Sequence, residues 1–249
     1  MTDIHVTTID GLKTALQTTG ANVFLDNDLD FNGVTMGSSA WCTITASDFD
    51  GQGHTLYNIQ SGNSGVIFKN GTYSNTVFKI HNTNFYNVLL LGTGYLFDGT
   101  SSTYHNMAIE ECKIQGKASR LFGAYMTAIG ATKCNFKING DCRITDTNFT
   151  LCYFDFDTPS AIFYTGSFLN ASDCYFKGHV KLPTGSFTST AFIRNVWNAY
   201  NDNATTPTMQ GTLNLYNSDR ATFFGGIGLT DAQLKDRDYI ANNTPFPIL

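Results

Sequence analysis

The tripeptide CYF occurs at residues 152–154 and again at 174–176, and it belongs to a series of similar tripeptides. Two earlier members, CKI at 112–114 and CNF at 134–136, give the four cysteines spacings of 22, 18 and 22 residues. A recurrence every 20 to 25 residues or so is typical of solenoids, in which each repeat forms one coil. A second series interleaves with the first, with GVIF at 65–68, GYLF at 94–97, SRLF at 119–122 and SAIF at 160–163.

The repeats lack any helical pattern, which excludes ankyrin, TPR and HEAT arrays. Short runs of strand-forming residues alternate instead with Asn, Gly, Asp, Ser and Thr. In each Cys-x-aromatic or Cys-x-aliphatic unit the cysteine and the apolar side chain lie two residues apart, so both point to the same side of a strand. The sequence therefore predicts an all-β fold, a parallel β-helix whose coils lie about 4.8 Å apart and whose bore contains columns of sulfur and rings.

The two ends of the chain differ from the middle. We expect residues 1–20 to form an N-terminal capping helix, because Ile9, Leu12 and Leu16 share one helical face and Thr7 with Asp10 fits a capping box. Gly20 fits a C-terminal stop for this helix. Residues 21–228 would form the parallel β-helix, with about nine coils. Residues 229–249 would form a short helix, from about residue 231 to 240, and an extended tail that closes the stack or contacts a neighbour.

Composition narrows the choice of partners. The chain of 249 residues carries a net charge of −5 with no run of Lys or Arg, which argues against nucleic acid. Charged residues make up 14%, well below the roughly 25% of an average domain. The start, MTDIHVTTID, shows no signal-peptide pattern, and no apolar run approaches the ~18 residues of a membrane span. Export by another route, or release by lysis, stays open.

The six cysteines contain no C-x-x-C pair, so a zinc ribbon is not expected. We expect reduced, buried thiols that act as small apolar side chains, although the sequence does not fix their disulfide state. The five histidines show neither HExxH nor HxH spacing. No metal and no cofactor is therefore expected.

Two early stretches, ANVFLDNDLDFNG at 21–33 and FDGQGHTLYNI at 49–59, resemble the opening coils of right-handed parallel β-helix proteins of the pectate-lyase-like superfamily. The GxIF and GxLF stretches resemble the GLUG repeats of bacterial surface proteins, and LTDAQLKD with PFPIL resembles the segment that closes such repeat domains. Similar coils occur in bacteriophage tail and virion-surface proteins. The resemblance implies a fold and leaves function open among lyases, hydrolases, adhesins and structural shafts.

The stretch FDGQGHTLYNI contains residue types that a catalytic site would use. A β-helix glycosidase needs two carboxylates about 5 to 9 Å apart, and Asp48, Asp50 and His54 are the candidates. The simpler interpretation is a corner between strands, in which Gly51 and Gly53 adopt positive φ and Asp50 forms an Asx turn. We predict the corner.

Two further groups of acidic residues are candidates for a calcium site or a catalytic pair. Asp26, Asp28 and Asp30 mimic the start of a calcium loop, but the sixth position is Phe31 and the twelfth is Gly37, so a solvated outer face is predicted. Asp155 and Asp157 flank the inward Phe156. They are the acidic pair expected if the protein is an enzyme, and solvating side chains if it is not.

One segment, 192–211, departs from the repeat rhythm and contains an aromatic pair. Trp197, Tyr200 and Asp202 are predicted to bind carbohydrate, because an aromatic platform beside amides and a carboxylate can stack a sugar ring and bind its hydroxyls. The alternative is that Trp197 packs into the bore.

These observations lead to a functional expectation. We expect a non-enzymatic structural or adhesion protein of a bacteriophage virion, such as a tail fibre, a tail or head appendage or a decoration protein. Its partners would be other virion proteins or copies of itself, as in trimeric appendages, and host-surface carbohydrate. It would be made in the host cytoplasm and lie on the virion surface. The alternatives are a polysaccharide lyase or glycoside hydrolase, and an extracellular bacterial surface adhesin module.

Overall fold

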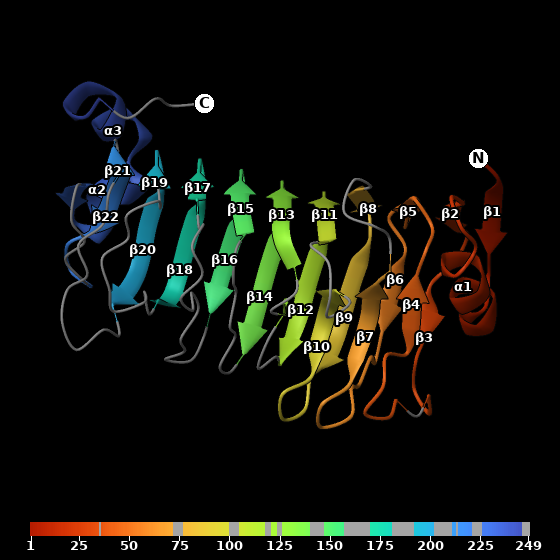
Figure 1. Ribbon diagram of the computed structural model, residues 1–249. Coiled ribbons are helices and arrows are strands. Elements are labelled where there is room, and N and C mark those ends of the chain that lie inside the picture. The colour runs from red at the N-terminus through yellow and green to blue at the C-terminus, as the bar shows by residue number, and fades with distance from the viewer. Residues whose placement is uncertain are drawn as a thin grey trace.

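The computed structural model describes residues 1–34, 36–71, 77–99, 105–117, 121–123, 126–139, 147–156, 170–180, 192–201, 211–212, 214–220 and 226–245. These residues form an elongated stack of coils, with the N-terminus at one end and the C-terminal helices at the other (Figure 1). Neighbouring strands pair in parallel along the whole stack, from the first pair, β1 with β2, to the last, β22 with β23. The predicted all-β parallel solenoid is confirmed, with only three short helices in the described part.

Three sheets run along the stack. Sheet A has ten strands, in the spatial order β1 (Asp3–Val6), β2 (Asn22–Leu25), β5 (Asp48–Asp50), β8 (Val77–His81), β11 (His105–Glu110), β13 (Met126–Thr132), β15 (Thr147–Thr150), β17 (Asn170–Ser172), β19 (Phe192–Ile193) and β21 (Gly211–Thr212). Sheet B also has ten, namely β3 (Leu29–Asp30), β6 (Thr55–Tyr57), β9 (Asn84–Leu89), β12 (Lys113–Lys117), β14 (Asn135–Asn139), β16 (Tyr153–Phe156), β18 (Tyr175–Val180), β20 (Val196–Asn201), β22 (Asn214–Asn217) and β23 (Gly226–Leu229). Sheet C has three, β4 (Cys42–Ile44), β7 (Val66–Asn70) and β10 (Tyr95–Gly99), and lies in the N-terminal half (Figure 1).

A two-residue corner joins sheet A to sheet B in every central coil. The first corner residue is left-handed, with φ between 48° and 56°, at Asn82, Glu111, Lys133, Leu151, Asp173 and Arg194. Five of these six residues are not asparagine, although the left-handed conformation costs a residue with a Cβ about 1–2 kcal/mol. The conformation therefore persists because the second corner residue and the stacked strands hold it in place.

At four of these six corners the second residue is the repeated cysteine, and its side chain points inward as predicted. Each thiol donates to the carbonyl two residues before it, at 3.2 Å for Cys112, 3.3 Å for Cys134, 3.4 Å for Cys152 and 3.3 Å for Cys174. Thr83 makes the same contact at 2.8 Å one coil earlier, with its hydroxyl. The four thiols thus act as hydrogen-bond donors as well as apolar groups, whereas the corner after Arg194 has the buried Asn195, whose side-chain amide donates to the Ala171 carbonyl at 2.8 Å.

Aromatic rings of the strands that follow these corners fill the bore. Phe136, Phe154, Phe176 and Trp197 follow one another in register, with nearly parallel rings and centroids 5.1, 4.8 and 4.0 Å apart. All four are buried. In the N-terminal half, Phe68, Phe97 and Phe122 form a second ladder with centroids 5.7 and 6.0 Å apart. A lone coil could not bury these rings, so each coil depends on the next.

The N-terminal cap differs in detail from the expectation for residues 1–20. Strand β1 precedes the helix, because Ile4 and Val6 alternate with polar residues and pair with β2. Helix α1 spans Ile9–Leu16, and its N-cap is Thr8, which accepts from the Gly11 amide, so the proposed Thr7–Asp10 capping box was wrong. Gly20 has positive φ but lies beyond the end of the helix.

The C-terminal cap contains two helices where one was expected. Helix α2 spans Asp231–Lys235 and begins with a full capping box between Thr230 and Gln233. The chain leaves the helical conformation at Asp236, whose carboxylate accepts from the Tyr239 amide and caps helix α3, Arg237–Asn243. Neither helix contains a fully buried residue. The last four residues of the expected tail, 246–249, lie outside the described residues.

The ring ladder predicts a large difference between neighbouring aromatic residues of β16. Phe154→Ala leaves a cavity between two stacked rings and should lower the free energy of unfolding by about 3–5 kcal/mol. Tyr153→Ala, which removes an outward ring one residue away, should cost about 1 kcal/mol or less. Urea unfolding followed by circular dichroism measures both. Equal losses for the two variants would contradict the inward ladder.

The buried thiols predict a loss of stability in alkali. Burial raises the pKa of Cys42 from 9.0 to about 12, the nearby Lys13 acting in the opposite sense. Between these values the unfolded chain loses a proton that the folded chain keeps. The contribution is therefore complete below pH 9.0 and lost as pH rises toward 12. The free energy of unfolding, measured at several pH values, should fall less steeply for Cys42→Ala than for the parent chain. Identical slopes would contradict the burial of this thiol.

Candidate functional site

The acidic residues that open the stack bind other parts of the protein. The Asp26 carboxylate lies 2.8 Å from the His5 ring and accepts from Gln52, and these hydrogen bonds, His5 first, lower the pKa of Asp26. Asp28 accepts from the Thr55 amide at 2.8 Å. Asp30 accepts from Asn32 and from Asn58 in the next coil. The three carboxylates thus link coils rather than converge on one cation.

The corner predicted in FDGQGHTLYNI is present. Asp50 accepts from the Gln52 amide at 2.8 Å, the expected Asx turn. Positive φ falls on Gln52 and Gly53, so its assignment to Gly51 was wrong. Gly51 is needed for a different reason, since a Cβ there would lie 2.7 Å from the Asn82 carbonyl oxygen.

His54, the histidine of this stretch, does not pair with Asp48 or Asp50. His54 lies 3.2 Å from Asp28, in the preceding coil. The residue beside Asp48 and Asp50 is His81, at 3.0 Å and 3.8 Å. His81 therefore bridges two carboxylates of the coil before it, and these three side chains are only partly exposed.

Only Asp155, of the acidic pair expected for an enzyme, lies among the described residues. Asp155 points outward from β16 and binds Lys177 of the next coil at 3.0 Å. This hydrogen bond raises the pKa of the Lys177 ammonium. Asp157 lies outside the described residues. Asp155 thus serves as an ion-pair partner on the outer surface.

The predicted carbohydrate platform is not formed by its proposed members. Trp197 is fully buried and stacks on Phe176, so it offers no surface to a sugar and the alternative interpretation, packing into the bore, is correct. Tyr200, three residues on, lies outside, 45% exposed, and stacks on His179 at 5.1 Å. Asp202 lies outside the described residues.

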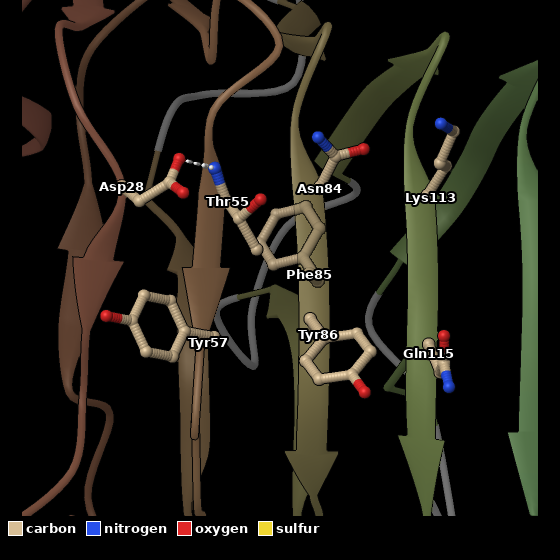
Figure 2. Close-up of a pocket in the computed structure, with 8 residues that line it drawn as sticks. All are labelled: Asp28, Thr55, Tyr57, Asn84, Phe85, Tyr86, Lys113 and Gln115. Atoms are coloured by element: carbon tan, nitrogen blue, oxygen red, sulfur yellow. Dashed lines mark hydrogen bonds between the residues drawn. The ribbon is translucent and has the colours of Figure 1, made fainter.

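A different aromatic platform lies on the outer face of sheet B. Strands β6, β9 and β12 border a shallow hollow of about 390 Å³ (Figure 2). Tyr57 and Tyr86 are register partners on adjacent strands and lie side by side, and Tyr86 is 53% exposed. The lining residues are Asp28, Thr55, Tyr57, Asn84, Phe85, Tyr86, Lys113 and Gln115.

Polar groups form a row beside the two tyrosines. Thr55, Asn84 and Lys113 occupy the same register position on the three strands. In Figure 2 these side chains and Asp28 lie at one level of the hollow, and the tyrosines with Gln115 lie at the other. Hydroxyl, amide, ammonium and carboxylate groups thus border the platform along one side.

A β-bulge places Tyr86 in this position. Tyr86 and Asn87 together oppose Gln115, and both are exposed. Asn87 has φ of 53°, and its side-chain amide donates to Asn58, the equivalent corner residue one coil earlier. Gly116 accommodates the bulge, because a Cβ there would lie 2.0 Å from the Val88 carbonyl oxygen.

The arrangement is suited to recognition by stacking and hydrogen bonding. A pair of tyrosine rings in a shallow hollow, bordered by amide and hydroxyl groups, can hold a planar or sugar-like ring against its apolar faces. In the described part of the chain, no cluster of three or more His, Cys, Asp or Glu is arranged to hold a metal ion. None of the described helices is long and apolar enough to span a bilayer.

Comparison of the chain with family models, with curated proteins and with solved structures found no match. The support for this hollow as a binding site therefore comes from its geometry. A sequence signal for it is the dipeptide Tyr-Asn at 57–58 and 86–87, although the same dipeptide also occurs at 200–201 and 216–217. In the copies at 57–58 and 86–87 the tyrosine faces outward from sheet B and the asparagine is left-handed.

The corrected position of Trp197 is open to a simple spectroscopic check. Both tryptophans, Trp41 and Trp197, are buried. We expect blue-shifted tryptophan emission with little quenching by iodide in the native state, and red-shifted, quenchable emission in urea. Strong iodide quenching of the native protein, retained in a Trp41→Phe variant, would place Trp197 at the surface and restore the original platform.

Proposed function

We propose that the chain is a right-handed parallel β-helix that acts as a non-enzymatic attachment protein of a bacteriophage virion and binds a host-surface saccharide. The observation that carries the binding is the paired Tyr57 and Tyr86 platform with its polar border. A right-handed course follows the strong preference of crossovers between parallel strands.

The hollow has the size and chemistry of a saccharide site. Its volume of about 390 Å³ falls within the range of small-ligand sites, about 300–1,000 Å³. Asn84, Gln115 and Thr55 offer both donors and acceptors at its border. Neutral amides and hydroxyls match sugar hydroxyls, and the rings supply the apolar contact that C–H faces of sugars need.

The engagement of the carboxylates favours binding over catalysis. Glycoside hydrolysis needs a carboxylic acid with a raised pKa beside a second carboxylate. Asp28, the acid of the hollow, accepts from the Thr55 amide and faces His54. Asp155 is held by Lys177. Both carboxylates are thus engaged by neighbouring groups of the stack, which supports a binding role.

A virion location agrees with the shape and the surface. The stack is elongated, with one helix at its N-terminal end and two at its C-terminal end (Figure 1), as expected of a shaft or appendage that other virion proteins or further copies of the chain contact at its ends. Its surface is poor in charge, with 14% charged residues in the chain. The resemblance of its coils to phage tail proteins adds to this placement. A bacterial surface adhesin module is the alternative.

Removal of one ring tests the site. Tyr86→Ala should weaken binding of a saccharide found by glycan-array screening by about tenfold, or about 1.4 kcal/mol, through loss of ring stacking. The control is Tyr239→Ala, an aromatic of helix α3 at the far end of the stack. Calorimetric titration gives both affinities. Equal affinities for Tyr86→Ala and the parent chain would show that the saccharide binds elsewhere on the protein.

The virion assignment has a separate test. Antibody raised against the folded chain should label purified phage particles at one structure in electron micrographs, and mass spectrometry of the particles should detect the chain. Its absence from particles of the phage that encodes it would refute the assignment.

A further inference from the structure

The hollow is one end of a longer surface on sheet B. Register pairs carry its polar row from Lys113 to Asn135, and then to Tyr153 and Tyr175. The row that contains Gln115 continues through Lys137 to Asp155. The outward side chains of β6 to β18 thus form two rows that run across the strands, parallel to the long axis of the stack.

A second aromatic platform ends the surface. The rings of Tyr153 and Tyr175 stack with centroids 5.4 Å apart and an interplanar angle of 6°. The Asn198 side chain donates to the Tyr175 hydroxyl at 2.8 Å and fixes that ring. Burial raises the pKa of Tyr153, with the Asp155 charge adding to the effect. The two platforms, on β6–β9 and on β16–β18, lie roughly 14 Å apart from β9 to β16 at about 4.8 Å per coil.

The surface between the platforms is positively charged. Lys113, Lys117 and Lys137 are exposed, and among the described residues no carboxylate lies within ion-pairing distance of their ammonium groups. Several lysines elsewhere on the stack form ion pairs, as Lys79 does with Glu110 at 2.9 Å and Lys133 does with Glu111 at 3.0 Å. A group of uncompensated cations is notable on a chain whose net charge is −5.

We infer that this surface binds an anionic polysaccharide that lies along the stack, with sugar rings on the two tyrosine platforms and acidic groups on Lys113 and Lys137. The inference rests on the proposed saccharide binding and adds the charge and the direction of the ligand. The coil spacing is comparable to the length of one sugar residue in an extended chain, so successive coils can meet successive residues. Charge complementarity favours an acidic over a neutral polymer and speeds its capture.

The test compares polymers of matched length with the intact chain. The probes are hyaluronate, which carries carboxylates, a wall teichoic acid, which carries phosphates, and neutral dextran. We expect at least one anionic probe to bind, more weakly as salt rises because exposed charges are screened, and dextran to bind at least tenfold more weakly. The double variant Lys113→Gln with Lys137→Gln should lower affinity for the anionic probe at least tenfold. The control Lys79→Gln, on the other face, should leave it unchanged.

Each other outcome has a defined meaning. Dextran binding that depends on Tyr86 and not on the lysines overturns this inference and leaves the proposed function intact. Failure of both anionic probes to bind overturns the inference. Poly-glutamate, an anionic polymer without sugar rings, is the control for charge alone, and binding equal to that of the anionic saccharides would also overturn the inference. Loss of anionic binding in both Tyr57→Ala and Tyr153→Ala would indicate a polymer that spans both platforms. Loss in only one of the two variants would indicate a polymer bound at that platform alone.

Discussion

The structure depends on the in-register stacking of inward side chains between successive coils. Each coil is too short to bury its own rings, so Phe154 is covered on one side by Phe136 and on the other by Phe176. The corner thiols also link successive coils, since the single S–H of Cys134 is shared between the Thr132 carbonyl of its own coil at 3.3 Å and the Ile109 carbonyl of the coil before at 3.4 Å. Stability is thus shared between neighbours, and the left-handed corners are retained because they direct both columns into the bore.

The same register that builds the bore also arranges the outer surface. Residues that alternate with buried rings lie in rows across the strands, so Tyr57 meets Tyr86 and Tyr153 meets Tyr175 without any loop that brings them together. A parallel solenoid therefore presents repeated groups at a fixed spacing, which suits a repeating ligand. The bulge at Tyr86 is a local departure that widens this pattern into a hollow.

Much of the fold could be predicted from sequence, because the Cys-x-aromatic units mark the corner and the following strand in one pattern. The binding surface could not, since its members come from different coils and their outward direction depends on register. Trp197 was misassigned for this reason: it differs from Tyr200 by an odd number of positions, so the two rings leave opposite faces of β20. The short strand β1 and the helix break at Asp236 were missed because four residues and one side-chain cap leave little periodic signal.

The most direct test of the stacking is a double-mutant cycle on adjacent rings of the ladder. Phe154→Leu, Phe176→Leu and the double variant would be unfolded in urea, and the coupling energy would be compared with that of Phe154→Leu and Phe68→Leu, which lie in different ladders. Stacked neighbours should couple by about 0.5–1.5 kcal/mol, and the distant pair should be additive within about 0.5 kcal/mol. Full additivity of Phe154 and Phe176 would contradict the account.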